Sequence, residues 1–378
     1  MDERFWEQDD VHVALPPGVE APGLAQAAAS LSLGGVCLFQ TSGSEGVPKW
    51  VVLRREAMLA SARAVCAHLE IGPADRWLLA LPQLHVGGFS IWARAAVSGC
   101  GVVQASVKWS PLDFCDQITE SRSTVASLVP AQVFDLVRAQ LRCPKVLRAA
   151  VVGGAGLDKA LGDRARELGW PLLQSYGMTE TSSQVATEPL EHLNGDFLPS
   201  EMRVLPVWRL GEVNELMTVQ GAPLAVGYMT NGGGKWRFEP MGEVLVTRDK
   251  GRISEREGHQ WMEFIGREKG MLKVLGELVS MHALQAILDR VCLENDSASS
   301  RMVVAAEPDE RLGHRLLLWF HSTEYSVTQA EAVRAEFNRH VRPFERIAHL
   351  QPSAVPVTNS MGKVMSLAND EKASEEST

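Results

Sequence analysis

The sequence lacks the features of a disulfide-stabilised, membrane-spanning or nucleic-acid-binding protein. Its six cysteines include no C-x-x-C pair and lie mostly within apolar segments, so we expect reduced core thiols and neither a zinc site nor a disulfide framework. No apolar run approaches the roughly 18–20 residues that span a bilayer. The net charge of −9 argues against nucleic-acid binding, which requires a basic excess.

The N-terminal sequence, residues 1–5, is acidic and also lacks the basic and apolar regions of a signal peptide. These absences together predict a cytoplasmic protein. What is present is a globular composition, because 45% of the residues are apolar. At 378 residues the chain exceeds the roughly 100–200 residues of a typical domain, so two or three units are expected.

Strand-like and helix-like segments alternate through the first two thirds of the chain. Such alternation is typical of an α/β protein with a layered sheet. The expected strands are residues 77–81, 101–103, 127–129, 149–152 and 171–173, and the expected helices are residues 89–97, 131–141 and 158–168.

From about Glu212 the pattern changes to short strands separated by glycine, proline and asparagine, which predicts a β-rich region. A smaller α+β unit follows Gly266. Its expected elements are helices 280–293 and 328–340 and strands 302–306 and 316–321. We therefore expect a large domain over residues 1–265 and a small one over residues 266–378.

Residues 41–49, Thr-Ser-Gly-Ser-Glu-Gly-Val-Pro-Lys, are the most informative stretch and follow a short apolar run. Two glycines, several hydroxyls and a lysine suit a backbone that bends around an anion. Glycines permit close approach, and backbone N–H groups and hydroxyls donate hydrogen bonds. The stretch does not match the Walker A pattern. Taken alone, a loop of this composition is more often an ordinary turn than a phosphate site.

This loop closely resembles the T-S-G-[ST]-T-G-x-P-K signature of the adenylate-forming enzymes, which include acyl- and aryl-CoA synthetases, luciferases and the adenylation domains of peptide synthetases. Further signatures of that superfamily follow in the right order, and the matches cover about residues 35–367. The resemblance implies ATP and Mg²⁺, a large layered domain and a small mobile C-terminal domain. It places at the nucleotide Thr41, Ser42, Gly43, Ser44, Gly46, Lys49 and Gly154.

Residues 174–181, Gln-Ser-Tyr-Gly-Met-Thr-Glu-Thr, match the superfamily's Y-G-x-T-E. The resemblance implies that Tyr176 packs on adenine, Thr179 meets the α-phosphate and Glu180 holds Mg²⁺. Ser175 and Gly177 are assigned to the same nucleotide site. A carboxylate is the hard oxygen ligand that magnesium prefers beside a nucleotide phosphate. An isolated match would instead indicate a strand end with a helix cap at Thr179.

Residues 246–251 resemble the superfamily's T-G-D-x-G, with Arg248 in place of the usual glycine. Here Asp249 would accept hydrogen bonds from both ribose hydroxyls, although a plain turn aspartate is the default interpretation without the neighbouring motifs. Residues 359–364 resemble the terminal N-x-x-G-K-[IV]. By that resemblance Lys363 reaches the carboxylate and the α-phosphate, because a mobile point charge suits a developing negative transition state.

Residues 266–279 resemble the stretch G-R-x-x-D-x-I-K-x-x-G-E-x-[VI] that joins the two domains of the superfamily, with Gly270 in place of a common aspartate. The resemblance implies that Arg267 binds ribose or phosphate. Lys269 takes the place of the hinge residue. Gly276 lies in the loop that lines the tunnel for the thiol of CoA.

Within the superfamily the chain is most similar to the o-succinylbenzoate–CoA ligases of menaquinone biosynthesis. Residues 81–94 resemble that family's L-P-x-x-H-[VI]-x-G followed by an arginine-bearing helix, and residues 178–184 also match. The resemblance places His85 at the gate of the acyl site, although a core histidine remains the alternative. It assigns to the acid site His85, Arg94, Ser182 and Gln184, and to catalysis Lys363, Glu180, Thr179 and His85.

Arg94 supports an acid site on physical grounds as well. It lies in an apolar helix flanked by glycines, and a buried arginine needs an anionic partner. o-Succinylbenzoate has two carboxylates, of which the aliphatic one is activated and the aromatic one needs a cation. The alternatives are that Arg94 pairs with an internal aspartate or glutamate, or that it reaches the surface.

Two departures from the superfamily pattern bear on activity. Glu45 stands where the phosphate loop normally has Thr or Ser, and a carboxylate beside a triphosphate is repulsive unless it points outward or shares a cation. Only about 40 residues precede the loop, where the superfamily has 100 or more. A shortened N-terminus would expose part of a sheet face, so we expect another chain or a homo-oligomeric contact to cover it.

The sequence thus predicts an ATP-dependent acid–thiol ligase that forms an acyl-adenylate and then an acyl-CoA, with o-succinylbenzoate as the acid. One alternative is another aryl- or acyl-CoA synthetase. The other is a catalytically idle homologue that binds only nucleotide or acyl ligand. Glu45 and the short N-terminus favour the idle homologue. The residues that oppose it are Glu180, Asp249, Arg267 and Lys363.

Overall fold

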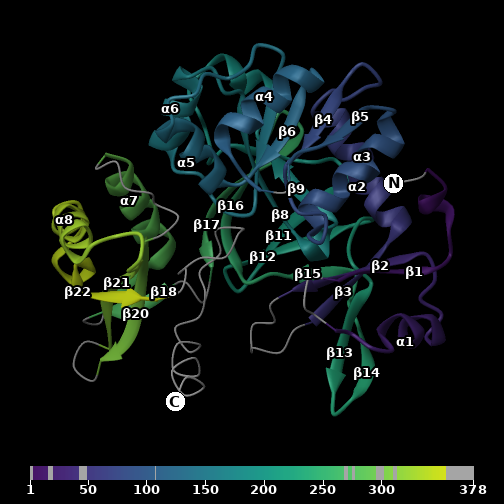
Figure 1. Cartoon of the computed structure of the whole chain (residues 1–378). Coiled ribbons are helices and arrows are strands. Elements are labelled where there is room, and N and C mark those ends of the chain that lie inside the picture. Colours follow the sequence, from purple (N-terminus) through teal and green to yellow (C-terminus); the bar gives the residue numbers. More distant parts are fainter. Residues whose placement is uncertain are drawn as a thin grey trace.

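A nine-stranded mixed sheet lies at the centre of the larger part of the computed structural model (Figure 1). The structure describes residues 3–15, 20–41, 49–106, 108–267, 271–274, 277–294, 302–309 and 313–354. The strand order of this sheet is β16-β17-β10-β9-β8-β7-β6-β4-β5. Its strands are β4 (Arg76–Leu79), β5 (Gly101–Gln104), β6 (Val125–Leu128), β7 (Ala149–Val152), β8 (Leu172–Met178), β9 (Ser183–Thr187), β10 (Met202–Val204), β16 (Asp249–Arg256) and β17 (His259–Arg267).

The strands from β5 to β8 are parallel neighbours, and β9 pairs antiparallel with β8. Helices connect the parallel strands, as such crossovers require. Local signals start two of these helices, since Ser110 and Asp158 accept hydrogen bonds from backbone N–H groups of the first turn. The helices of this part are α2 (Arg55–His68), α3 (Val86–Ser98), α4 (Pro111–Ser121), α5 (Pro130–Arg138) and α6 (Lys159–Glu167).

Both faces of the central sheet are buried at its inner strands β6 and β7, which explains the continuous apolar runs there. Successive side chains of a strand point to opposite faces, so neighbouring residues enter different cores. Leu78 belongs to one buried cluster, whereas Trp77 and Leu79 belong to the other. In the same way Val152 and Val151 of β7 lie in different clusters.

A second sheet carries the residues on either side of the loop at 42–48. Its order is β1-β2-β3-β13-β14, and its strands are β1 (Val11–Ala14), β2 (Val36–Thr41), β3 (Lys49–Arg54), β13 (Gly227–Gly232) and β14 (Lys235–Pro240). Buried clusters cover both faces of this second sheet, and the expected contact with another chain stays a prediction. Leu24 and Ala28 of α1 (Leu24–Ser30) pack on one face, and Phe5 and Phe89 contribute to the cluster on the other.

A small three-stranded sheet, β11-β12-β15, completes the β-rich region. Its strands are β11 (Trp208–Val213), β12 (Leu216–Gly221) and β15 (Val244–Val246). The remaining strands of this region join the two larger sheets, because β13 and β14 extend the second sheet and β16 and β17 extend the central one.

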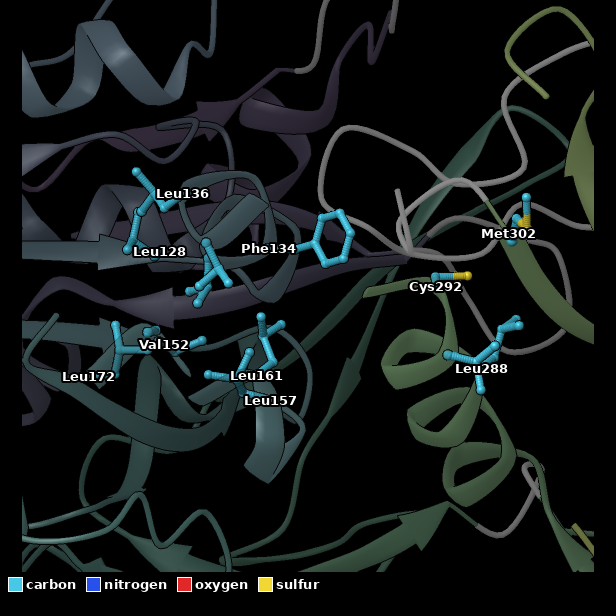
Figure 2. Close-up of a cluster of buried hydrophobic side chains, with 14 of the residues drawn as sticks. Leu128, Phe134, Leu136, Val152, Leu157, Leu161, Leu172, Leu288, Cys292 and Met302 are labelled. Atoms are coloured by element: carbon cyan, nitrogen blue, oxygen red, sulfur yellow. The ribbon is translucent and has the colours of Figure 1, made fainter. Parts of the chain in front are cut away.

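The C-terminal elements form separate small sheets and two helices, drawn in green and yellow in Figure 1. They are β18 (Met271–Val274), β19 (Glu277–Ser280), α7 (Met281–Glu294), β20 (Met302–Asp309), β21 (Gly313–His321), α8 (Val327–Phe337) and β22 (Ile347–Ser353). Buried residues of α7 continue the apolar cluster of α5. Figure 2 shows Phe134 of α5 projecting toward Cys292 and Leu288 of α7.

The predicted α/β class with a β-rich region and a small α+β unit is confirmed. The expected strands and helices are all present, with ends that differ by a few residues. Helices α1, α2 and α4 were not predicted, and β16 and β17 join the central sheet instead of a separate β-rich unit. The domain boundary at residue 265 stays a prediction. Among the described residues, no helix is long and apolar enough to cross a membrane.

A partly buried ion pair between Asp75 and Arg148 links the residues that precede strands β4 and β7. Arg148 Nε and Nη2 donate to the two carboxylate oxygens of Asp75 at 2.8 and 2.9 Å, and Thr124 Oγ1 donates to Asp75 at 2.7 Å. Arg148 also donates to the carbonyl oxygens of Leu69 and Glu70 after α2. The hydrogen bonds from Arg148 lower the pKa of Asp75 to about 2.

This lowered pKa predicts how the stability changes with pH. Because the pKa of Asp75 is lower in the folded chain, the ion pair stabilises the fold above the ordinary aspartate pKa, and the contribution disappears as the pH falls from about 4 toward 2. Asp75→Asn should lower the free energy of unfolding by about 1–2 kcal/mol at pH 7. The difference from the wild type should shrink at pH 4 and below, measured by urea unfolding.

Glu263→Gln is the control, because it removes a carboxylate paired with the exposed Arg252. We expect that variant to show little change in stability at either pH. A difference for Asp75→Asn that stays constant between pH 7 and pH 3 would contradict the assigned ion pair.

Candidate active site

The candidate site is organised by the connection between β8 and β9, where the central sheet changes from parallel to antiparallel. A Cβ atom on Gly177 would lie 1.8 Å from the carbonyl oxygen of Ser183, so only glycine permits this approach. Ser182 and Ser183 follow with φ angles of 54° and 108°. Positive φ is costly for a non-glycine residue, and such strain gathers at functional sites.

Tyr176 and Asp249 meet at the end of β8 that leads into this connection. Tyr176 Oη donates to Asp249 Oδ2 at 2.8 Å, and both residues are buried. The Tyr176 ring also stacks on Phe264 with the ring centroids 6.0 Å apart. Asp249 is paired with Arg267 in the register of β16 and β17, so the backbones of these two predicted nucleotide residues are adjacent.

The glycine-rich segment 153–156 is held against β8 by the side chain of Gln174. Gln174 Oε1 accepts from Leu157 N at 2.8 Å, and its Nε2 donates to the carbonyl oxygen of Ala155 at 3.2 Å. Ser175 Oγ donates to the carbonyl oxygen of Val152 at 2.9 Å. The structure therefore places Gly154, just after the end of β7, near Ser175 of the neighbouring strand β8, and both residues were predicted from the sequence.

Glu180 lies in the short 3₁₀ turn η2 (Thr179–Thr181), between the central sheet and the second sheet. Tyr228 Oη of β13 donates to Glu180 Oε1 at 3.2 Å. Lys49 Nζ lies 5.4 Å from the centroid of the Tyr228 ring. Burial and the nearby Glu180 carboxylate raise the pKa of Tyr228, so it remains a donor at neutral pH. Thr41 and Lys49 are paired where β2 and β3 meet the loop.

Arg94 is the most unusual charged group of the site. Its side chain is 1% exposed, and burial lowers its pKa to about 10. Nη2 donates to Ser183 Oγ at 3.1 Å, and the guanidinium lies over the Trp77 ring at 4.8 Å. Within the described part of the chain, no carboxylate forms an ion pair with Arg94, and both Arg94 Nε and Trp77 Nε1 are buried without a hydrogen-bond acceptor.

The other residues predicted to contact the acid have different surroundings. His85 is half-buried and directly precedes α3. Ser182 is fully buried and its Oγ donates to the carbonyl oxygen of Pro223 at 2.8 Å. Gln184 is buried and accepts from Thr187. These contacts of Ser182 and Gln184 are internal, and their role toward a ligand stays a prediction.

Several predicted site residues lie outside the described residues. They are Ser42, Gly43, Ser44, Glu45, Gly46, Lys269, Gly276 and Lys363. Gly177 lies in β8, and Thr179 begins the η2 turn that follows it. Among the residues that the structure describes, no group of three His, Cys, Asp or Glu could hold a metal ion by itself.

Comparisons with known proteins agree with this architecture. The sequence model of the AMP-binding enzyme family matches residues 22–213. The chain is 29% identical to the 2-succinylbenzoate–CoA ligase of Escherichia coli K12 over 303 residues, which are 80% of this chain and 62% of that protein. It is 36% identical to the Bacillus subtilis 2-succinylbenzoate–CoA ligase over 150 residues, 40% of this chain and 31% of that protein.

Solved structures show the same fold. The o-succinylbenzoate CoA synthetase (MenE) of Bacillus subtilis with the acyl-adenylate intermediate OSB-AMP superposes with a TM-score of 0.69 at 23% identity, over 87% of this chain and 67% of that one. An arginine-to-lysine variant of E. coli MenE with bound OSB-AMS superposes with a TM-score of 0.65 at 24% identity, over 90% of this chain and 68% of that one.

The solved structures share the fold of this chain. The match to the AMP-binding enzyme family confirms the predicted adenylate-forming superfamily. The chain belongs to the AMP-binding enzyme family, whose match covers half of it. It spans about 31–63% of the length of the curated relatives that it matches.

Sequence reasoning missed three residues that shape the site. Ser183 binds Arg94, Tyr228 binds Glu180, and Phe264 stacks on Tyr176. Ser183 lies within the matching stretch of residues 178–184, so the sequence contained a signal that could have identified it. Tyr228 and Phe264 meet their partners only through strand pairing across distant parts of the chain, which no local pattern indicates.

The close approach at Gly177 predicts a strong local effect of a single methyl group. Gly177→Ala places Cβ against the Ser183 carbonyl, so β8 and β9 must separate. We expect a loss of at least about 2 kcal/mol in the free energy of unfolding, typical of steric strain at a packed site. Binding of a fluorescent ATP analogue should weaken as well, because Tyr176 and Glu180 flank the bend.

Gly242→Ala is the matched control, because nothing lies within 4 Å of a Cβ at that position. It should be close to neutral in the same unfolding and binding measurements. Equal stability of Gly177→Ala and Gly242→Ala would show that the close approach does not constrain the connection.

Proposed function

We propose that the chain is an ATP-dependent acid–CoA ligase of the cytoplasm that activates o-succinylbenzoate, giving o-succinylbenzoyl-CoA for menaquinone biosynthesis. Membership of the AMP-binding enzyme family and relatives that are 2-succinylbenzoate–CoA ligases support the reaction class. The observation that carries the choice of acid is the buried Arg94, which has no carboxylate partner among the described residues.

The acid site follows from the energetics of that arginine. A buried charge without a counter-ion costs several kcal/mol, and the Ser183 hydroxyl and the Trp77 ring compensate only part of this cost. A ligand carboxylate near Ser183 would supply both the missing charge and the missing acceptors. o-Succinylbenzoate fits because its aromatic carboxylate remains free when the aliphatic one is activated.

The nucleotide site is assigned to the opposite side of the β8–β9 connection. Asp249, oriented by Tyr176, presents a carboxylate that can accept hydrogen bonds from ribose hydroxyls. The Tyr176 ring faces the adenine, Thr179 faces the α-phosphate, and Lys49 neutralises phosphate charge. The loop at 42–48, with Gly154, Gly177 and Arg267, completes the proposed nucleotide contacts.

The oxygen ligands at the proposed site suit a Mg²⁺ ion that binds together with the nucleotide. Magnesium usually keeps one or two carboxylates together with phosphate oxygens and water, and Glu180 is one such carboxylate beside Lys49 and Tyr228. The ion supplies charge neutralisation at the phosphates when it is bound. The protein contributes the Glu180 carboxylate, which is oriented by the hydrogen bond from Tyr228.

The two half-reactions are proposed to use the two domains, 1–265 and 266–378, hinged at Lys269. The acid carboxylate attacks the α-phosphate of ATP and pyrophosphate leaves. The CoA thiol, entering past Gly276, then attacks the acyl carbon and AMP leaves. No protein nucleophile is required, so catalysis consists of positioning and charge stabilisation, with His85 at the acyl site and Lys363 at the attacking carboxylate.

An idle nucleotide-binding homologue is the second candidate, favoured by Glu45 in the predicted phosphate loop. A pyrophosphate-release screen across carboxylic acids, with ATP, Mg²⁺ and CoA present, separates the candidates. We expect o-succinylbenzoate to give the highest rate. A different preferred acid would indicate another acyl-CoA synthetase, and nucleotide binding without release for any acid would indicate the idle homologue.

Arg94→Ala tests the assignment of the acid. Removal of a cation that pairs with a buried carboxylate costs about 2–5 kcal/mol, so the KM for o-succinylbenzoate should rise tens-fold or more. The KM for ATP should remain unchanged in the same steady-state assay, because the described contacts of the Arg94 side chain are with Ser183 and Trp77 and not with a proposed nucleotide residue.

Arg55→Ala is the matched control, since Arg55 is also buried but already forms an ion pair with Asp10 at 2.7 Å. That variant should lose stability without an acid-specific rise in KM. If Arg94→Ala leaves the KM for o-succinylbenzoate unchanged, Arg94 is structural and the acid is a different one.

A further inference from the structure

Tyr228 lies where the second sheet meets the β8–β9 connection, and no motif pointed to it. In the register of β13 and β3, Tyr228 is opposite Val51, two residues from Lys49. Gly227 precedes it, and a Cβ there would lie 2.3 Å from the carbonyl oxygen of Glu239. Glycine at 227 thus lets the β13–β14 hairpin close tightly directly beside Tyr228.

Two contacts fix Glu180 from this strand region. Ala225 N donates to the carbonyl oxygen of Glu180 at 2.8 Å, and Tyr228 Oη donates to Glu180 Oε1 at 3.2 Å. Within the described part of the chain, Tyr228 provides the only hydrogen bond to the Glu180 carboxylate. One carboxylate oxygen is therefore held by a neutral donor, and the other is left for a further partner.

The ring of the same tyrosine lies beside Lys49. Lys49 Nζ is 5.4 Å from the ring centroid, and it is 3.7 Å from Glu239 Oε2. A cation within about 6 Å of an aromatic ring is attracted by the negative face of the ring. Tyr228 therefore contacts both charged groups that the proposed function places at the phosphates, the carboxylate through its hydroxyl and the ammonium through its ring.

We propose that Tyr228 is a positioning residue that orients Glu180 toward the divalent cation of the nucleotide and orders Lys49 beside the phosphates. This inference rests on the proposed function for the location of the phosphates. A hydrogen bond from an outer residue fixes the direction of a ligating carboxylate, and the loss of such a bond typically weakens metal binding by about 10–100-fold. The hydroxyl and the ring have separate roles, so they can be tested separately.

The experiment measures the affinity for Mn²⁺, which replaces Mg²⁺, in the full chain with a non-hydrolysable ATP analogue. Free Mn²⁺ is quantified by its electron paramagnetic resonance signal. Tyr228→Phe removes only the hydroxyl. We expect it to weaken Mn²⁺ binding about tenfold or more, and to leave the affinity for the metal-free nucleotide within about twofold.

Tyr228→Leu removes the ring as well, so it should weaken both Mn²⁺ binding and metal-free nucleotide binding. Tyr325→Phe is the matched control, because it deletes a tyrosine hydroxyl in the C-terminal part of the chain, and it should leave both affinities unchanged. Glu180→Gln is the reference for loss of the ligating carboxylate. Thermal unfolding of each variant shows whether it is folded.

The outcomes separate this inference from the proposed function. If the wild type binds Mn²⁺ with the nucleotide more tightly than Glu180→Gln, but Tyr228→Phe equals the wild type, the role of Tyr228 is wrong while the metal assignment stands. If the wild type and Glu180→Gln bind Mn²⁺ equally, Glu180 is not the metal ligand, and both assignments fail. The inference is supported if Tyr228→Phe binds Mn²⁺ about tenfold more weakly than the wild type and Tyr325→Phe does not.

Discussion

The contact between Gly177 and the carbonyl group of Ser183 is the constraint on which the candidate site depends. It forces the chain to reverse at the end of the parallel strands, and it carries Ser182 and Ser183 into positive φ. Tyr176, Glu180 and Ser183 all lie in or beside this reversal. The proposed nucleotide and acid sites are therefore two sides of one bend, which suits a reaction that joins the two ligands.

The same bend provides the Ser183 hydroxyl that partly compensates the buried charge of Arg94. Arg94 is buried with a hydroxyl and an aromatic ring in place of a counter-ion, and Trp77 Nε1 beside it also has no acceptor among the described residues. A fold selected for stability alone would favour an apolar side chain at such a position. Buried charge that the described chain leaves uncompensated is most simply explained by a ligand that brings the opposite charge.

The sequence predicted the parts of the fold that local patterns determine. Short apolar runs of three to five residues located β4, β6 and β7, and the helices between them followed from the alternation. The incorporation of β16 and β17 into the central sheet was not predictable, because their pairing depends on contacts with β10 that are distant in sequence. Likewise the motifs located Glu180 and Arg94, but their partners Tyr228 and Ser183 are 48 and 89 residues away along the chain.

The most direct test of the central claim is a thermodynamic cycle measured by isothermal titration calorimetry. Wild type and Arg94→Met are each titrated with a non-hydrolysable o-succinylbenzoyl-adenylate analogue and with the same compound lacking the aromatic carboxylate. If that carboxylate pairs with Arg94, the two changes are coupled by about 2 kcal/mol or more, so removing either partner removes most of the effect of the other. A coupling energy within error of zero would show that Arg94 and the carboxylate do not meet, and would contradict the proposed acid site.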